Sequence, residues 1–458
     1  MMMAKNSTAT TPQSNWKPYP SYKDSGAEWL GKIPAHWEVR RLKNIASVEL
    51  SNVDKKSVEG QDSVRLCNYV DVYNNERITA DLDFMAATAT PEQARRFALR
   101  NGDVLITKDS ESWTDIAVPA VVSEDLPGVI CGYHLAHVRP YKQCNGAFLS
   151  RAFAAIGPRD QFQVAANGIT RFGLGSDAIR TGLFPIPPRN EQSLIAAFLD
   201  RETQKIDALM AKKERLIELL QEKRVALITR AVTKGLDPTV PMKDPGVEWL
   251  GQIPVHWEVK RLKFLASEIT VGIVVTPAKY YVDSGIPCLR SLNIASGHIV
   301  SEDMMYISEE SNRLHKKSRL RAGDVIIVRT GLAGTAAIVT EEFDGSNCVD
   351  LLIIRKSKRL VPQFLYYFIN SDAAAGQVQA HSVGAIQAHY NTATLGDLMA
   401  LAPPLKEQER IVAFLNAETA KLDDLIAKVL EGIEKLKEYR TALISTAVTG
   451  KIDVREAV

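Results

Sequence analysis

EQSLIAAFLDRETQKIDALMAKKERLIELLQEKRVALITRAVT occupies residues 191–233, and EQERIVAFLNAETAKLDDLIAKVLEGIEKLKEYRTALISTAVT occupies residues 407–449. The two stretches align without a gap at an offset of 216 positions, the difference between 407 and 191. Neither contains a proline, and each follows a pair of prolines. Both are therefore predicted to be long helices, each about 65 Å long at roughly 1.5 Å per residue.

Apolar residues recur within both stretches in steps of three and four, the spacing that lets one helix lie along another. The seam consists of Ile206, Met210, Ile217, Leu220, Leu227 and Ala231, and then of Leu422, Ile426, Val429, Ile433, Leu436, Leu443 and Ala447. Lys213 interrupts it in the first copy and Arg224 and Arg440 interrupt it at equivalent positions, and such polar seam residues can fix register. A lone helix would leave this stripe in water. We therefore expect the two copies to pack together, although an ordinary long helix packed on its own domain is the alternative.

A second repeat precedes each helix by a long interval. KDSGAEWLGKIPAHWEVRRLK at 23–43 returns as KDPGVEWLGQIPVHWEVKRLK at 243–263, with 16 of 21 positions identical. The period of about 220 residues is far longer than that of a solenoid repeat. The chain is therefore predicted to contain a duplicated unit, each consisting of a domain and a helix.

Between these repeats lie two β-rich regions, residues 44–183 and about 264–400. Each contains a glycine-aspartate turn leading into a buried strand, GDVLIT at 102–107 and GDVIIV at 323–328. Other parts of the two regions scarcely align. One frame that holds two different interiors suggests the same task performed on two different targets.

Composition bounds the possible functions. The 458 residues carry a formal net charge of +2, and the five cysteines form no CxxC pair. A disulfide framework or zinc cluster is therefore not expected, and we expect a cytoplasmic protein. The sequence lacks an apolar run of the ~18 residues that a membrane helix needs, and its N-terminus does not resemble a signal peptide.

Catalytic motifs are absent from the sequence. It contains no GxxxxGK[ST], HExxH, GxSxG or GxGxxG pattern, so we expect a binding protein with no catalytic residues and no metal site. Nucleic-acid binding would depend on local basic patches, although such charge runs are usually solvated faces. The candidate patches are Arg95, Arg96 and Arg100, then Arg313, Lys316, Lys317, Arg319 and Arg321, then Arg355, Lys356, Lys358 and Arg359.

The paired blocks EWLGxIPxHWEVxRLK, the GDV strand, and PPxxEQ followed by IxxFLxxET resemble the specificity subunit of type I restriction-modification systems. The resemblance extends from about Lys23 to Asp453. It implies an α+β fold: two globular, α/β-mixed target recognition domains separated by two long antiparallel coiled-coil helices, with an internal pseudo-twofold duplication. The expected boundaries are a disordered tail at 1–20, recognition domain 1 at 21–190, spacer helix 1 at 191–235, recognition domain 2 at 236–405, spacer helix 2 at 406–450 and a C-terminal tail at 451–458.

The resemblance also implies partners. Each recognition domain would read one half of an asymmetric site in double-stranded DNA. The subunit would bind two modification (methyltransferase) subunits, and restriction (translocase and nuclease) subunits would join them. No cofactor is expected in this chain, because S-adenosylmethionine, ATP and Mg²⁺ are expected on the partner subunits.

Candidate site residues follow from position in the two units. For DNA binding we predict Lys108, Asp109, Ser110, Thr170, Arg171, Arg329, Thr330 and Gln387, from the loops after the GDV strands and the glycine-led segments before the prolines. Arginine and glutamine suit guanine and adenine edges. For partner binding we predict Trp29, Trp37, Trp249, Trp257, Glu191, Gln192, Glu407 and Gln408.

Two other functions remain open. A methyltransferase or nuclease acting alone would need a cofactor loop and catalytic motif that the sequence does not show. A coiled-coil adaptor that joins two proteins without touching DNA would also fit the balanced charge. Salt-dependent binding of duplex DNA separates the adaptor from the DNA-recognition subunit.

Overall fold

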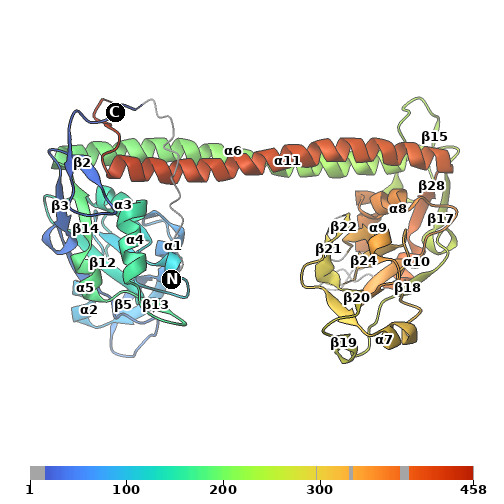
Figure 1. Cartoon of the computed structure of the whole chain (residues 1–458), viewed down its shortest axis with the longest axis horizontal. Coiled ribbons are helices and arrows are strands. Elements are labelled where there is room, and N and C mark those ends of the chain that lie inside the picture. The colour runs from blue at the N-terminus through green and yellow to red at the C-terminus, as the bar shows by residue number, and fades with distance from the viewer. Residues whose placement is uncertain (1–15, 296, 330–333, 382–390, 457–458) are drawn as a thin grey trace. The chain divides into compact units, whose positions relative to one another are not determined.

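The two long helices are α6 (Arg189–Lys234) and α11 (Leu405–Val448). The computed structural model describes residues 16–295, 297–329, 334–381 and 391–456 (Figure 1). It divides into two compact units. Unit 1 comprises Met1–Lys213 with Glu431–Val458, and unit 2 comprises Glu214–Leu430, so that each unit contains a part of both helices.

Within each unit the two helices run antiparallel. In unit 1, Asp207 contacts Arg440, and Lys213 lies beside Gly432. In unit 2, Arg224 contacts Asp423, and Gly235, just past the end of α6, lies beside Glu407. Residue numbers thus rise along α6 as they fall along α11. The predicted seam is confirmed, because its members include the buried residues Ile206, Leu220, Leu422, Val429, Ile433, Leu443 and Ala447.

The seam arginines occupy equivalent positions and form equivalent ion pairs. Arg440 Nε lies 2.9 Å from Asp207 Oδ1 in unit 1, and Arg224 Nε lies 3.2 Å from Asp423 Oδ1 in unit 2. Asp207 and Asp423 are themselves related by the offset of 216 positions. Each copy of the helix therefore donates one acid and one base to its twin, which explains how a polar residue is accommodated in the seam.

A glutamine in the first turn attaches each long helix to its globular domain. Gln192 donates to the carbonyls of Pro187 (2.9 Å) and Gln143 (3.1 Å) and accepts from Asn145 N (2.7 Å). Gln408 repeats this set in unit 2 with Pro403 O (2.8 Å), Arg359 O (2.9 Å) and Val361 N (2.8 Å). The repeated PPxxEQ motif is thus a clamp between the helix start and the preceding domain.

Unit 1 contains a five-stranded sheet of order β4-β12-β8-β10-β6 and a three-stranded sheet of order β11-β5-β7. The bounds of the first sheet are β4 (Ala46–Leu50), β12 (Leu135–Pro140), β8 (Val104–Thr107), β10 (Pro119–Val122) and β6 (Arg77–Ile78). Those of the second are β11 (Val129–Cys131), β5 (Asp62–Cys67) and β7 (Met85–Ala89). Its shorter helices are α1 (Tyr69–Asn74), α2 (Pro91–Arg96), α3 (Gly146–Ala154), α4 (Ile156–Ala165), α5 (Ser176–Thr181), η1 (Leu42–Asn44) and η2 (Trp113–Asp115).

Unit 2 has four-stranded sheets of order β18-β27-β24-β25 and β19-β23-β20-β26. The bounds of the first are β18 (Ile269–Val271), β27 (Leu351–Ile354), β24 (Val325–Val328) and β25 (Ala336–Ile338). Those of the second are β19 (Tyr281–Val282), β23 (Met305–Ile307), β20 (Ile286–Leu289) and β26 (Asn347–Cys348), and β21 (Ile294–Ala295) pairs with β22 (His298–Ile299). Its shorter helices are α7 (Glu309–Leu314), α8 (Pro362–Ile369), α9 (Asp372–His381), α10 (Thr392–Asp397), η3 (Glu248–Leu250), η4 (Leu262–Phe264), η5 (Pro277–Tyr280), η6 (Ser291–Asn293) and η7 (Glu341–Phe343).

The two interiors share a topology despite their divergent sequences. The order β4-β12-β8-β10 in unit 1 matches β18-β27-β24-β25 in unit 2. In both units a further strand pair is parallel, β11 with β5 and β26 with β20, and the inner strand of that pair is antiparallel to β7 or β23. The duplication therefore includes the interiors as well as the frames.

The repeated frame segments form small hairpins and strand pairs at the base of each helix. In unit 1, β1 (Tyr22–Asp24) pairs with β2 (Lys32–Pro34), and β3 (Glu38–Arg41) pairs with β14 (Leu183–Ile186). In unit 2 the same pairs are β15 (Met242–Lys243) with β16 (Ile253–Pro254) and β17 (Glu258–Arg261) with β28 (Met399–Ala402).

The predicted disordered tail at 1–20 is wrong for its last residues. Tyr19 is 3% exposed, and Trp16 packs edge-on against Phe198 with ring centroids 4.8 Å apart. Beyond α11, Ile452 and Val454 are buried in the same core. Residues 1–15 of the predicted tail lie outside the described part of the chain.

We expect the charges of Arg224 and Asp423, the ion pair in the unit 2 seam, to be interchangeable. Either single variant, Arg224→Asp or Asp423→Arg, should destabilise the protein by about 0.5–1 kcal/mol, the range of partly exposed ion pairs, because like charges then meet in the seam. The double variant should recover most of that loss in thermal unfolding. If the double variant were as unstable as the sum of the two singles, the pair would not set the register.

Candidate nucleic-acid interface

Two predicted DNA-binding loops of unit 1 meet at one edge. Strand β9 (Asp109–Ser110) directly follows the GDV strand and pairs with β13 (Phe172–Gly173). Leu174 N also donates to Lys108 O at 2.8 Å. Residues 108–110 therefore lie beside residues 172–174, about sixty positions away in sequence, and Arg171 directly precedes this pairing. The structure brings these candidates together, and DNA contact by them stays a prediction.

Charged side chains at this edge form a chain of contacts. Asp109 pairs with Lys108, and its Oδ2 lies 2.9 Å from His134 Nδ1. Arg171 Nη2 lies 3.1 Å from the His134 ring nitrogens. Burial raises the pKa of Asp109, but hydrogen bonds from Lys108 and His134 outweigh it, so that the pKa lies below its usual value. The carboxylate therefore stays charged and acts as an acceptor at neutral pH.

A hollow of about 540 Å³ opens beside this edge. Tyr69 and Tyr73 stack in its wall with ring centroids 5.6 Å apart. Its remaining lining residues are Asp109, Ser110, Glu111, Ser112, Asp115 and Arg171. Carboxylates accept from the amino groups of cytosine, and arginine donates to guanine, so this lining offers both kinds of base-edge contact.

Exposure divides the predicted residues of unit 1 into two groups. Thr170 and Arg171 are exposed and Asp109 is partly exposed. Lys108 and Ser110 are buried at 8% and 7%; Lys108 lies 5.0 Å from the centre of the Tyr133 ring, and Ser110 Oγ accepts from Tyr69 at 3.3 Å. Lys108 and Ser110 therefore present little surface at this edge, and DNA contact by their side chains stays a prediction.

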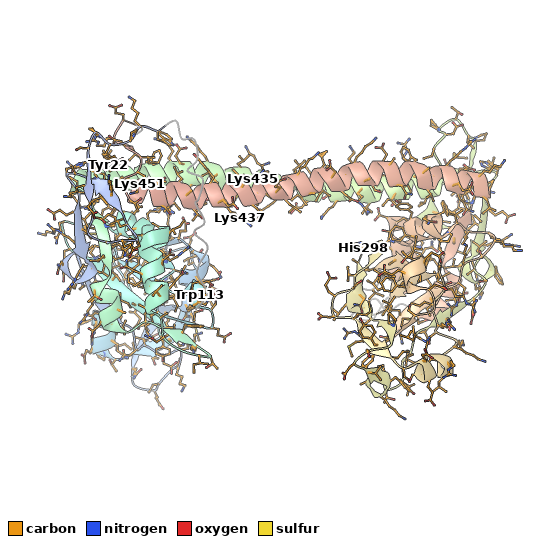
Figure 2. The ribbon with its side chains drawn as sticks, in the orientation of Figure 1. Tyr22, Trp113, His298, Lys435, Lys437 and Lys451 are labelled. Atoms are coloured by element: carbon orange, nitrogen blue, oxygen red, sulfur yellow. The ribbon has the colours of Figure 1, made fainter. Side chains whose placement is uncertain are left out.

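Sequence reasoning missed the aromatic part of this surface. Tyr69 and Tyr73 are spaced by four residues on α1, and Trp113 is 51% exposed on η2 (Figure 2). The pair of tyrosines in YVDVYN was a usable signal, since residues four apart share a helix face. Its closeness to residues 109–115 depends on tertiary packing and could not be read from spacing.

In unit 2 the equivalent strand β24 leads to Arg329. Its Nη1 lies 2.8 Å from Asp350 Oδ1, and its side chain is 36% exposed. Thr330 and Gln387 lie outside the described residues. The predicted DNA-binding role of all three stays a prediction.

The GDV aspartates have a structural role next to these edges. Asp103 is 2% exposed and binds Arg139 through both carboxylate oxygens at 2.8 Å, and His137 Nε2 lies 2.9 Å from Oδ2. Burial raises the pKa of Asp103, but Arg139 and His137 outweigh it and leave the pKa below its usual value. In unit 2, Asp324 pairs with Arg355, and both are buried.

The frame residues predicted to bind partners lie largely inside the chain. Trp37, Trp257, Gln192 and Gln408 are at most 1% exposed, and Glu191 is 5% exposed. Glu191 Oε1 accepts from Trp37 Nε1 at 3.0 Å and from the Tyr19 hydroxyl at 2.5 Å. These five side chains present almost no surface, because their contacts hold the frame to the helix. Partner binding by them stays a prediction.

The other three frame residues keep some exposed surface. Trp29 packs on Gly157 of α4, and Trp249, 44% exposed, packs on Gly376 of α9. The Glu407 side chain is 28% exposed and contacts His256 at 2.8 Å. Partner binding by Trp29, Trp249 and Glu407 stays a prediction.

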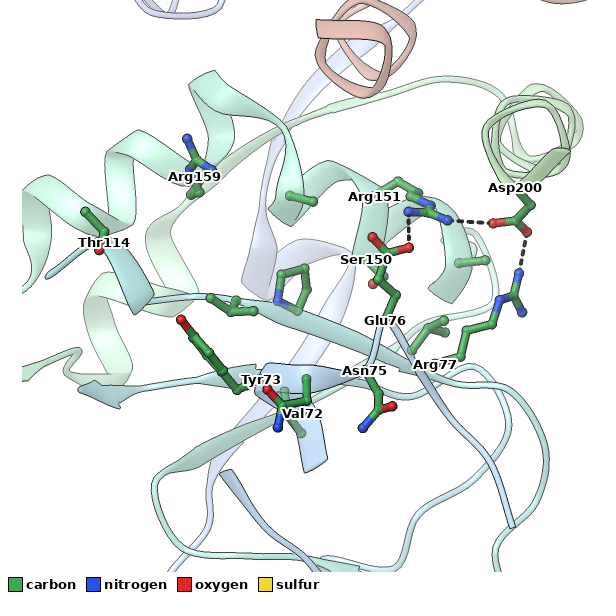
Figure 3. A pocket seen from close by; sticks show the side chains of 16 residues that line it. Val72, Tyr73, Asn75, Glu76, Arg77, Thr114, Ser150, Arg151, Arg159 and Asp200 are labelled. Atoms are coloured by element: carbon green, nitrogen blue, oxygen red, sulfur yellow. Dashed lines mark hydrogen bonds and ion pairs between the residues drawn. The ribbon is translucent and has the colours of Figure 1, made fainter. Parts of the chain in front are cut away.

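A partly exposed charge network connects the unit 1 domain to its helices (Figure 3). Arg151 of α3 contacts Glu76 at 2.7 Å and Asp200 of α6 at 3.0 Å, and Arg440 of α11 contacts Glu76 at 2.6 Å. Burial raises the pKa of Glu76, but the two arginines outweigh it and lower the pKa below its usual value. A cavity of about 270 Å³ lies against this network.

The equivalent joint in unit 2 is neutral. Tyr367 stands where unit 1 has Arg151, at an offset of 216, and its hydroxyl donates to Asn416 Oδ1 at 2.8 Å. Asn416 in turn replaces Asp200. The same position of the repeated frame is thus occupied by an ion pair in unit 1 and by a neutral hydrogen bond in unit 2.

The described residues contain no cluster of three or more His, Cys, Asp or Glu side chains placed to hold a metal ion. The five cysteines are free thiols in the interior, and burial raises the pKa of each. Among the described helices, none is long and apolar enough to cross a membrane.

Residues 34–219 and 254–435 match the family model described as the type I restriction modification DNA specificity domain. The two matched segments correspond to the two copies of the repeat and cover most of the chain. The chain belongs to this family.

Relatives of the family share low identity with this chain. The EcoKI type I restriction enzyme specificity subunit of Escherichia coli K12 is 21% identical over 442 residues, which cover 92% of this chain and 90% of that protein. The MjaVIII specificity subunit of Methanocaldococcus jannaschii is 24% identical over 277 residues, 59% of this chain. This chain spans 62% of that protein's length, less than two thirds.

Solved structures share the fold of this specificity-domain protein. The HsdS subunit of Thermoanaerobacter tengcongensis superposes with a TM-score of 0.52 at 17% identity, covering 92% of this chain and 98% of that one. A chain from a structure of a type I R-M system gives a TM-score of 0.63 at 19% identity, covering 91% and 98%. The fold class implied by the resemblance is therefore confirmed.

The buried carboxylate of the first GDV strand should matter for stability. Asp103→Asn should destabilise the protein by about 2–3 kcal/mol at neutral pH, because Arg139 and His137 lose a charged partner. The folded pKa is lowered, so this stabilisation is present above the ordinary aspartate pKa of about 3.9 and is lost as pH falls through the lower, folded pKa. The gap between wild type and variant in thermal unfolding should therefore narrow below about pH 4.

The exposed variant Asp54→Asn is the control, with an expected effect within about 0.5 kcal/mol. An Asp103→Asn protein as stable as the control would contradict the assigned structural role.

Proposed function

We propose that this chain is the DNA sequence-recognition subunit of a type I restriction-modification complex, without catalytic activity of its own. Each unit reads one half of a bipartite, asymmetric site. The observation that carries the proposal is the pair of equivalent strand ends, at β8 and β24, which present different chemistry on one shared topology. Unit 1 presents tyrosines, carboxylates and Arg171 there, and unit 2 presents the Arg329–Asp350 pair.

Different side chains at equivalent positions require different half-sites. The described part of unit 1 can accept from base amino groups through Asp109 and donate to guanine through Arg171. Phosphate contacts position such a domain, while base-edge contacts specify the sequence. An asymmetric site follows, because the two reading edges are not copies of each other.

The paired helices provide the docking surface for two modification subunits. In unit 2, Leu216 and Leu219 of α6 and Leu425 and Leu430 of α11 are 40–50% exposed although they are apolar. Exposed apolar residues on paired helices are suited to contact with further helices. We propose that those subunits, joined by restriction subunits, supply S-adenosylmethionine, ATP and Mg²⁺.

The test is a map of methylated adenine in host cells that carry wild-type or variant chains. Wild type should produce one split, asymmetric motif that disappears when the gene is deleted. Arg171→Ala should relax or weaken one half of that motif by about 1–3 kcal/mol of discrimination and leave the other half unchanged. Lys142→Ala, an exposed change elsewhere in unit 1, is the control.

A map unchanged by deletion of the gene would overturn the proposal. A coiled-coil adaptor would give that result and would still co-purify with its partners. An Arg171→Ala map identical to wild type would remove Arg171 from the reading surface but leave the subunit's role intact.

A further inference from the structure

One basic loop occurs in both units at the same place. It reads RRFALRNGDV at 95–104 and KKSRLRAGDV at 316–325, leading into β8 and β24 respectively. Three basic positions coincide: Arg95 with Lys316, Arg96 with Lys317, and Arg100 with Arg321. All six side chains are exposed, whereas the interleaved residues Phe97, Leu99, Ser318 and Leu320 are buried. We call these two segments the basic loops.

The backbone of the two basic loops is bonded in the same way. Gly102 N donates to Val122 O at 2.9 Å, and Gly323 N donates to Val339 O at 2.8 Å. Both glycines have φ of +87°, a conformation that other residues rarely adopt. An aspartate caps each turn at 3.0 Å, Asp125 on Asn101 N and Asp344 on Ala322 N.

An ion pair with a buried aspartate supports the backbone of each loop. Arg139, held by Asp103, donates to Ala98 O at 2.7 Å. Arg355, held by Asp324, donates to Arg319 O at 2.8 Å and to Lys317 O at 2.7 Å. The backbone that carries the basic side chains is therefore rigid in both units, which a merely solvated charge run does not require.

Acidic side chains lie near both basic loops. In unit 1, Glu49 pairs with Arg96, Glu92 also acts on Arg96, and Asp125 caps the turn. In unit 2, a hollow of about 880 Å³ is lined by four basic residues, Lys316, Lys317, Arg319 and Arg321, and by Glu268, Glu341 and Asp344. In unit 2 the four basic residues of the hollow outnumber its three acidic ones. In unit 1, Arg95 and Arg100 lie outside the Glu49–Arg96 pair.

We propose that the basic loops are phosphate clamps, which hold the DNA backbone in the same way in both units and carry no sequence information. The proposal rests on the proposed function and adds a division of labour within each unit. Outside the repeated frame the two sequences scarcely align, yet this loop keeps its charges, its turn and its buried support. Lysine and arginine side chains contact phosphate oxygens, and such contacts set register on the duplex.

The experiment measures binding of a random-sequence duplex pool by the full chain, alone and in complex with its modification subunits, over a range of salt concentrations. Two variants each remove three charges: R95Q/R96Q/R100Q and K316Q/K317Q/R321Q. The control K23Q/K32Q/K43Q removes three exposed lysines from the unit 1 frame. Sequencing the bound fraction reports the selected motif, and thermal unfolding confirms that each variant is folded.

The plot of log K against log salt has a negative slope. Each loop variant should make this slope shallower by about 2 to 3, since each lost phosphate contact contributes about 0.9. The selected motif should not change, and the control should keep the wild-type slope. If both loop variants kept the wild-type slope and still selected the motif, the phosphate-clamp proposal would be wrong and the proposed function would stand. Loss of one half of the motif would also overturn the phosphate-clamp proposal, because the loop would then read bases. A wild-type chain that neither binds nor selects DNA would overturn the proposed function as well.

Discussion

The structure depends on covering the apolar stripe of two very long helices. Neither α6 nor α11 could remain in water with its seam exposed, and in each unit a part of one helix covers a part of the other. Because the two helices are copies, each contributes the same acid and the same arginine to the pairing, as in Asp207–Arg440 and Arg224–Asp423. Each seam arginine is paired with an acid, so placing its charge in the seam costs little free energy. These pairs also define the register of the two helices. Everything else in each unit is attached to this pair.

Attachment is achieved by a small set of repeated contacts. Gln192 and Gln408 clamp the helix starts, and the GDV aspartates pin the loops that lead into the central strands. Where the copies differ, the substitutions are matched: Arg151 with Asp200 in unit 1 becomes Tyr367 with Asn416 in unit 2. A frame of this kind tolerates different interiors, because the contacts that carry the domain are independent of the residues at the strand ends. The proposed function, one task performed on two sequences, requires that independence.

The sequence predicted the parts of the molecule that depend on local pattern. Heptad spacing identified the seam, and the repeated blocks identified two equivalent units. It could not predict burial: Trp37, Gln192, Lys108 and Ser110 are interior, and their contact with partners or DNA stays a prediction. It also missed Tyr69 and Tyr73, because their place beside Asp109 results from packing between segments forty residues apart. The shared strand order of the two interiors was hidden for a similar reason, since different side chains can fill the same sheet.

The central claim is that one frame carries two independent reading domains. The most direct test replaces residues 44–182 with residues 264–398, which gives a chain that carries the unit 2 interior twice. The account predicts that this chain, assembled with its modification subunits, directs methylation to a symmetric site built from two copies of one wild-type half. A folded chimera that still methylates the wild-type asymmetric site would contradict the account.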